Sequence, residues 1–227
     1  MSDNYIHKDY PKTVGRKEFW KQIKRTVNGR EVSEKDIQTI VSAVKAGMCL
    51  NKKDNLLDLG CGNGALASRF FADINRYQGV DFSPYLLEIA AEHFFVEGKT
   101  TYQELDLSLD FEKIKNISAF NKVLMYGAFA YLKREVASDL LRFLGELKHV
   151  RQVYLGNIPN SEFAENFYSK RDITQFDTDD HNSAIGVWWS TTQLCRIVSD
   201  AGFSPKVYKM PDHFYASKYR FDIVGSK

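Results

Sequence analysis

The sequence lacks a paired cysteine pattern, a long apolar run and a surplus of charge of one sign. It has three cysteines, Cys49, Cys61 and Cys195, and no CxxC pair, which argues against a disulfide framework and a cysteine-bound zinc. The stretch from Met1 to Lys12 is polar and has no apolar signal core, and no apolar run approaches the roughly 20 residues of a membrane-spanning helix. We therefore expect a cytoplasmic protein without a membrane partner.

The formal net charge is only +2, which does not favour a nucleic-acid partner. Of the 227 residues, 44% are hydrophobic and 26% are charged, as in ordinary soluble domains. This length suits one α/β domain with a substantial core.

From Asn55 onward, short apolar strands alternate with helical patterns. The expected strands are Leu56–Leu59, Tyr77–Asp81, Thr101–Leu105, Lys122–Tyr126, Gln152–Leu155, Val207–Met210 and Arg220–Val224, and the expected helices are Ala65–Asp73, Pro84–Phe94, Lys133–Lys148 and the stretch from Ser190 to Gly202. Such alternation predicts a mostly parallel sheet with helices on both faces. The connection between the last two strands is too short for a parallel pair, so we expect the last strand to run antiparallel.

Residues ahead of the first strand show two helical patterns. In one, around Lys17–Val27, the apolar residues share one face; in the other, Ser33 is the expected N-cap and Gly47 the left-handed residue after the helix. We expect residues 1–50 to form a helical lid on a domain of residues 51–227. The insert 157–189 is too long for a bare connection, and we expect it to cap the strand ends.

Three glycines, Gly60, Gly62 and Gly64, stand where the first strand turns into the first helix. Glycine permits unusual backbone angles there and lets a ligand approach the backbone. Asp81 ends the second strand, where a carboxylate can accept hydrogen bonds from a ribose diol. The glycine pattern also satisfies the loose dinucleotide motif, so an NAD-dependent enzyme stays open at this point.

The segment Leu57–Gly64 resembles motif I of the class I S-adenosylmethionine (SAM)-dependent methyltransferases, and Gly79–Ser83 resembles motif II. Glu104–Leu107 resembles the adenine-contacting segment, and Val123–Gly127 resembles the segment along the methionine moiety. The resemblance implies a Rossmann-like seven-stranded sheet in the order 3-2-1-4-5-7-6 and SAM as cofactor. It implies these cofactor-binding residues: Asp58, Gly60, Cys61, Gly62, Asn63, Gly64, Asp81, Phe82, Ser83, Asp106, Leu107 and Met125.

The function implied is methyl transfer to an oxygen or nitrogen atom of a small-molecule acceptor. The predicted catalytic residues are His181, as a general base, and Tyr126, and the predicted substrate-binding residues are Tyr126, Tyr131, Trp188 and Trp189. The consecutive Asp179, Asp180 and His181 match no common metal motif, and we predict no metal. The alternatives are an RNA or protein methyltransferase and a SAM-binding protein without catalysis. We expect a monomer or a homodimer.

Overall fold

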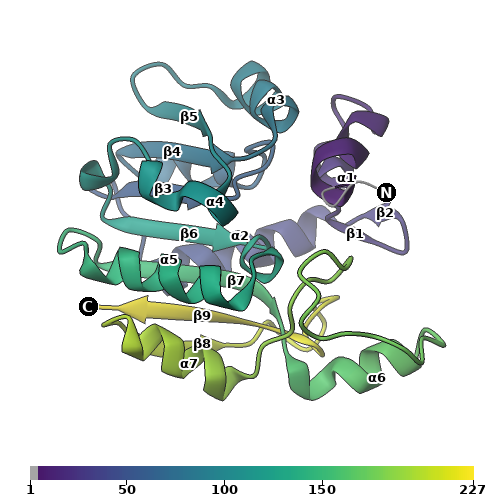
Figure 1. The fold of residues 1–227 in the computed structure, drawn as a ribbon. Coiled ribbons are helices and arrows are strands. Elements are labelled where there is room, and N and C mark those ends of the chain that lie inside the picture. Colours follow the sequence, from purple (N-terminus) through teal and green to yellow (C-terminus); the bar gives the residue numbers. More distant parts are fainter. Residues whose placement is uncertain (1–4) are drawn as a thin grey trace.

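Seven strands form the central sheet of the computed structural model, which describes residues 5–227 (Figure 1). They are β3 (Asn55–Leu59), β4 (Arg76–Asp81), β5 (Thr100–Glu104), β6 (Lys122–Tyr126), β7 (Gln152–Pro159), β8 (Ser204–Tyr208) and β9 (Arg220–Ser226). Their order is β5-β4-β3-β6-β7-β9-β8. β9 runs antiparallel to its neighbours β7 and β8, and all the other neighbouring strands are parallel. Counted from β3, this is the predicted order 3-2-1-4-5-7-6, so the predicted fold is confirmed.

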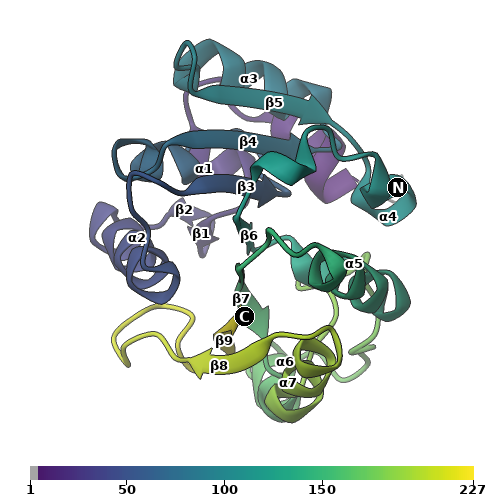
Figure 2. The ribbon, with the colours of Figure 1, turned by 90° about the vertical axis from the view of Figure 1, so that its left-hand side faces the viewer.

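Helices cover both faces of this sheet (Figure 2). The α-helices are α1 (Phe19–Gln22), α2 (Glu34–Met48), α3 (Pro84–Phe94), α4 (Leu107–Asp110), α5 (Arg134–Glu146), α6 (Ala164–Ser169) and α7 (Thr191–Asp200). Short 3₁₀ or π segments are η1 (Tyr5–Asp9), η2 (Tyr10–Thr13), η3 (Ala67–Asp73), η4 (Phe111–Lys113), η5 (Ile117–Ala119), η6 (Phe129–Tyr131) and η7 (Ser161–Phe163). None of the helices within residues 5–227 has the length and apolar character needed to cross a membrane.

Two apolar cores fill the space between the sheet and its helices. Side chains alternate between the faces of a strand, so the neighbours Leu56 and Leu57 in β3 enter different cores. Leu57 packs with residues of α5 and α7, and Leu56 packs with residues of α2. Because β3 is buried on both faces after its first residue, its sequence from Leu56 to Leu59 is apolar except for Asp58.

Helix α2 begins at the predicted residue but ends later than predicted. The Ser33 hydroxyl accepts the backbone N–H of Asp36 at 3.1 Å, which confirms the predicted N-cap. The helix does not end before Gly47: it continues to Met48, and Cys49 takes the left-handed conformation at φ +47°. Gly47 serves packing instead, because a Cβ there would lie 2.7 Å from Cε2 of Tyr154.

The predicted helix over Lys17–Val27 is wrong beyond Gln22. After α1 the chain forms a hairpin from β1 (Thr26–Val27) and β2 (Arg30–Glu31). Its turn residues Asn28 and Gly29 both have positive φ, at 50° and 76°. An Asn-Gly pair favours this tight hairpin turn, and that local preference overrides the helical spacing of the apolar residues.

The predicted division at residue 50 stays a prediction, and the first four residues of the expected lid lie outside the described part. Within that part, α2 and Val32 belong to a core of the sheet, and the segment 5–31 precedes them, with Trp20 packed against the same core. Figure 1 shows the β1–β2 hairpin and α6 on the side toward which β6 points. The segment and the insert 157–189 therefore flank the carboxyl ends of the parallel strands.

The two positions at the end of α2 are expected to respond oppositely to substitution. Gly47→Ala forces a Cβ against the Tyr154 ring and is expected to lower the free energy of unfolding by about 1–3 kcal/mol. Cys49→Gly removes the steric cost of a left-handed backbone at a residue other than glycine. It is expected to raise the free energy of unfolding by up to about 1 kcal/mol. Urea denaturation of both variants measures the difference. A loss of stability in Cys49→Gly would contradict this description of the helix end.

Candidate functional site

The glycine loop that follows β3 is held against the end of β4. The backbone N–H groups of Gly60 and Cys61 donate to the Val80 carbonyl at 2.8 and 3.1 Å. Gly60 has φ +74°, and a Cβ there would lie 2.3 Å from Cβ of Ala128. Gly64 has φ +75°, and it allows the loop to pack against Ala90 of α3, whose Cβ would be 3.2 Å away. Gly60 and Gly64 thus allow the loop to lie close to Ala128 and to α3.

Asp81, at the end of β4, organises this loop. One carboxylate oxygen accepts the Gly62 N–H at 2.8 Å, and the other accepts the Ser83 N–H at 2.9 Å. The side chain is buried, and burial raises the pKa of Asp81 to about 6, against the lowering effect of its backbone hydrogen bonds, which include one from Phe82. These backbone donors leave the carboxylate with lone-pair capacity for a further donor.

Asp58, inside β3, is a second buried carboxyl group at the loop. Its partner is the Tyr77 hydroxyl, which donates at 3.1 Å. Burial raises the pKa of Asp58 to about 7; the hydrogen bond from Tyr77 and the charge of Arg25 act to lower it, and Asp81 acts to raise it. A carboxyl group with this pKa ionises readily when a cation binds near it.

The other predicted cofactor residues divide between capping and core roles. Asp106 accepts the Ser108 N–H at 2.9 Å and caps α4, and its charge also acts on Asp81. The Ser83 hydroxyl caps α3 in the same way. Leu107 and Met125 are buried in the core that α5 and α7 cover, so their side chains pack rather than face the strand ends.

Asn63 anchors the N-terminal segment to the loop. Its amide is fully buried and donates to the Phe19 carbonyl and to the Gln22 side chain, both at 2.8 Å. Beyond Gln22, a methyl group of Ile23 lies 2.9 Å from the position that a Cβ on Gly62 would occupy. The segment therefore covers the glycine loop directly.

Tyr126 is the last residue of β6, and Tyr131 lies beyond the end of this strand. The Arg25 guanidinium lies over the Tyr126 ring, with Cζ 4.8 Å from the ring centre. The Tyr131 hydroxyl donates to the Ala184 carbonyl at 3.0 Å, and its ring meets His7 edge-on at 4.1 Å. Burial raises the pKa of both phenols, so both are neutral at physiological pH.

The structure places Trp188 and Trp189 in the protein interior, with no exposed surface. Trp188 packs with the rings of α6 and donates to the Tyr168 hydroxyl at 3.2 Å. Trp189 packs against Phe129 and beneath the Arg134 guanidinium. Both indoles therefore pack the insert onto the domain, which differs from the predicted contact with substrate.

His181 lies on the same insert, in a loop held to α5 by an ion pair between Asp179 and Arg134. Among residues 5–227, the structure gives its ring no hydrogen-bond partner. Its role as a base stays a prediction.

Three further residues, His7, Arg25 and Asn157, lie with the tyrosines. His7 is partly buried, its buried Nε2 atom has no hydrogen-bond partner within the described residues, and burial, with the charge of Lys24, lowers its pKa to about 4. Arg25 is 8% exposed. Asn157, just inside the end of β7, has a left-handed backbone at φ +63°. The basic run around Arg25 was visible in the sequence, but burial of one of its members was not.

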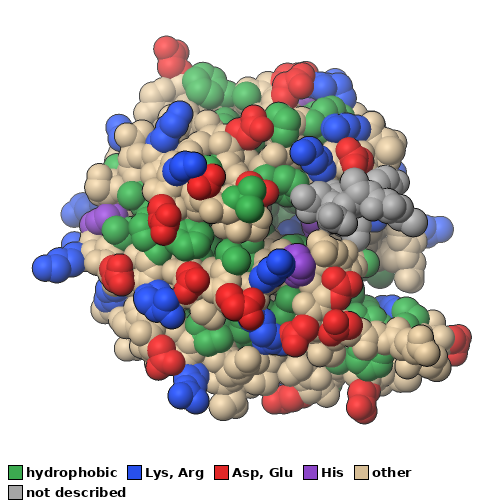
Figure 3. All heavy atoms as spheres, in the orientation of Figure 1, with side chains coloured by type: hydrophobic (Ala, Val, Ile, Leu, Met, Phe, Trp, Pro, Cys, Tyr) green, Lys and Arg blue, Asp and Glu red, His purple; other side chains and the backbone are tan. Residues whose placement is uncertain are grey.

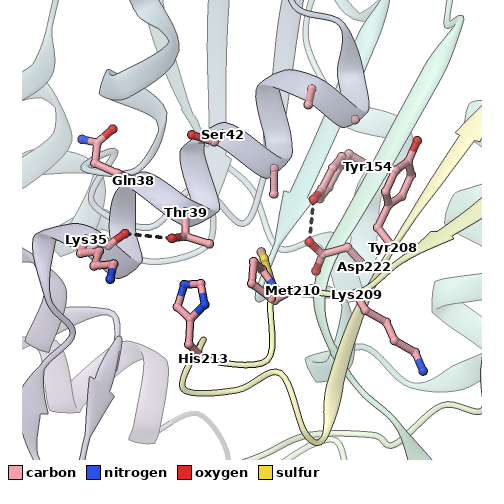
Figure 4. A pocket seen from close by; sticks show the side chains of 14 residues that line it. Lys35, Gln38, Thr39, Ser42, Tyr154, Tyr208, Lys209, Met210, His213 and Asp222 are labelled. Carbon is pink, nitrogen blue, oxygen red and sulfur yellow. Dashed lines mark hydrogen bonds between the residues drawn. The ribbon is translucent and has the colours of Figure 1, made fainter.

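A groove of about 490 Å³ lies elsewhere, between α2 and the β8–β9 connection (Figure 4). Lys35 and Thr39 line it from α2, and His213 lines it from the connection. At its floor the Tyr154 hydroxyl donates to Asp222 at 2.6 Å. The groove lies on a face of the sheet and does not include the glycine loop. In the described part of the chain, no group of three or more His, Cys, Asp or Glu residues is placed to hold a metal ion.

Residues 57–150 match the family model of a methyltransferase domain. A comparison with curated protein sequences finds no match.

Three solved structures illustrate the likeness in fold. The methyltransferase domain of bacterial CtHen1 is 18% identical, with a TM-score of 0.60, over 85% of this chain and 99% of that one. Magnesium protoporphyrin IX methyltransferase from Synechocystis PCC 6803, with bound S-adenosylhomocysteine (SAH), is 17% identical, with a TM-score of 0.66, over 99% and 97%. Phosphoethanolamine N-methyltransferase 2 of Haemonchus contortus is 16% identical, with a TM-score of 0.60, over 84% and 52%.

The family model covers the strands that carry the glycine loop, Asp81 and Tyr126, and the sheet has the strand order implied by the sequence motifs. On these grounds residues 57–150 form a methyltransferase domain, and the fold of the chain is that of solved SAM-dependent methyltransferases.

Proposed function

We propose that this protein transfers the methyl group of SAM to an oxygen or nitrogen atom of a small-molecule acceptor, without a metal. The observation that carries the proposal is Asp81, a buried carboxylate that joins the glycine loop to the end of β4. SAM supplies a methyl group already activated on a sulfonium, so the protein contributes mainly alignment and exclusion of water.

The residues at the loop suit an adenosyl amino acid. Asp81 accepts from ribose hydroxyls with its remaining lone pairs, while the backbone from Gly60 to Gly64 lies along the ligand. Asp58 offers negative charge to a cation, and burial raises its pKa despite the hydrogen bond from Tyr77 and the charge of Arg25. Phe82 and Asp106 follow β4 and β5, on the side of the loop proposed for the adenine.

The surroundings support a small acceptor. The N-terminal segment and the insert 157–189 flank the strand ends, which limits the size of an acceptor that reaches the loop. On the face shown in Figure 3, acidic and basic side chains are interspersed, which does not favour a polyanionic partner. Two of the compared enzymes are named for small acceptors, a metalloporphyrin and phosphoethanolamine.

Acceptors that lose a proton need a base, and two histidines qualify. His181 was predicted from the sequence, and Tyr126 is the predicted hydroxyl at the reaction site. His7 is a second candidate, because its ring is neutral at pH 7 and its Nε2 is free within the described residues.

Asp81→Asn is expected to weaken binding of SAM and SAH roughly 10–100-fold, because hydrogen bonds to a charged acceptor contribute about 1.5–3 kcal/mol. Titration calorimetry with SAM, SAH and NAD measures it. The control is Asp110→Asn, an exchange at the end of the short helix α4, with unchanged affinity. Equal affinity of wild type and Asp81→Asn for SAH, or binding of NAD alone, would refute the assignment.

Binding of SAM is expected to depend on pH through Asp58. The folded protein holds a proton on this group up to about pH 7, and a bound cation favours the ionised form, so binding releases a proton near neutrality. Affinity should rise roughly tenfold from pH 6 to pH 8, since one pKa unit corresponds to a factor of ten. Calorimetry in buffers of different ionisation enthalpy counts the protons. The rise should flatten in Asp58→Asn, and an unchanged slope there would assign the titration to another group.

Replacement of the catalytic histidine is expected to lower kcat about 100-fold or more for a hydroxyl acceptor while SAH affinity stays unchanged. His181→Ala and His7→Ala, compared in one methyl-transfer assay, identify which histidine acts. If both variants keep full activity on a hydroxyl acceptor, no histidine base operates.

A further inference from the structure

Arg25 is a buried cation that forms no ion pair with another residue of the described part of the chain. Its side chain is 8% exposed, and its Nε and Nη1 atoms make no hydrogen bond within residues 5–227. None of the ion pairs among these residues includes it. Its contact is the face of Tyr126, an attraction that does not replace hydrogen bonds. Burial of an unpaired charge is strongly unfavourable, so this geometry calls for an anion.

The nearby carboxyl groups are engaged elsewhere. Asp222 accepts the Tyr154 hydroxyl with one oxygen at 2.6 Å and the Asn157 N–H with the other at 2.7 Å. Asp58 accepts the Tyr77 hydroxyl. Burial raises the pKa of both carboxyl groups, and the charge of Arg25 acts on both, but neither forms a hydrogen bond or an ion pair with it in the described part of the chain.

Two N–H donors converge on one point beside Gly127. The position that a Cβ on Gly127 would take lies 3.6 Å from Nη2 of Arg25 and 3.5 Å from Nδ2 of Asn157. A side chain there would fill this space, and Gly127, with φ +80°, leaves it clear. The Asn157 amide has no other hydrogen-bond partner in the described part of the chain.

The backbone of Asn157 is held in an unusual conformation that directs this amide. Its φ of +63° is rare for a residue other than glycine. Asp222 accepts its N–H, and the Arg220 guanidinium donates to its carbonyl. Strained residues fixed from both sides are common at ligand sites. Arg220 adds a second positive charge beside the same tyrosines, since it and Arg25 both act on Tyr126, Tyr131 and Tyr215.

This point adjoins the proposed reaction site. Gly127 is followed by Ala128, whose Cβ lies 2.3 Å from the position of a Cβ on Gly60 in the glycine loop. A group bound beside Gly127 is therefore next to the loop on the side away from Asp81. The aromatic rings of Tyr126 and Tyr131 lie around it.

We propose that Arg25 and Asn157, supported by Arg220, bind an oxyanion of the methyl acceptor, a carboxylate or phosphate group. This rests on the proposed function. An arginine fork and an amide donor match the several acceptor oxygens of such a group. The protein is thus selective for acidic acceptors, with the anion held beside Gly127 and the rest of the molecule among the tyrosines.

The test compares benzoate with its neutral analogue benzamide, on the protein saturated with SAH, by ligand-observed NMR titration. Wild type is expected to bind benzoate at least tenfold more tightly than benzamide. The preference should vanish in Arg25→Met and in Asn157→Gly, which keeps the left-handed backbone and removes only the amide. It should persist in Lys24→Met, the neighbouring cation, which lies over the Tyr10 ring.

The outcomes separate this proposal from the proposed function. If wild type binds SAH but shows no preference for benzoate, or if the preference survives in either site variant, the acceptor site is wrong and the methyltransferase assignment stands. If Arg25→Met weakens SAH binding tenfold and leaves the benzoate preference intact, Arg25 holds the carboxylate of the cofactor and the proposal is overturned. If wild type does not bind SAH at all, the proposed function fails first.

Discussion

The pair of hydrogen bonds that Asp81 accepts from Gly62 and Ser83 is the constraint on which the site depends. β3 and β4 run parallel and in register up to Leu59 and Val80, so the chain segments leaving them start side by side. One carboxylate then bridges the two segments, and the Val80 carbonyl adds two more bonds to the loop. Without the carboxylate, the buried N–H groups would lose their partners. The cost is the burial of Asp81, visible as its pKa of about 6.

A second constraint joins this loop to the N-terminal segment. Asn63 belongs to the glycine motif, yet its amide binds Phe19 and Gln22 and not the strand ends. The same segment places Arg25 over Tyr126 and His7 against Tyr131. The loop that backs the proposed cofactor therefore also positions side chains on the acceptor side. The chain between Phe19 and Arg25 thus connects the loop to that side.

The sheet could be predicted from the sequence because its signals are local. Apolar strands, the Ser33 and Ser83 caps and the glycine loop each specify structure within a few residues. The order of the strands came from the resemblance to a family. The hairpin after α1 is also signalled locally, by Asn28-Gly29. The helix predicted over Lys17–Val27 rested on the spacing of apolar residues and did not take this turn signal into account.

The acceptor side depends on contacts between distant segments and was not predictable in the same way. Arg25 stands in a basic run that is typical of a solvated helix face, and only packing against β6 reveals that it is buried. Trp188 and Trp189 are aromatic residues of the kind that line pockets, but their neighbours in space place them in the core. The feature that distinguishes Asn157 is its left-handed backbone conformation, and no residue pattern in the sequence specifies that conformation.

The charges at the strand ends are arranged in two groups, and the boundary between them is the contact of Gly60 with Ala128. Asp58, Asp81 and Asp106 belong to the β3, β4 and β5 side, where a cationic sulfonium ligand would be stabilised. Arg25 and Arg220 belong to the β6, β7 and β9 side. Asp222 is the exception, but its two oxygens are occupied by Tyr154 and Asn157. A cationic donor and an anionic acceptor would each bind the group of opposite charge, and this separation would orient them toward each other across the glycine loop.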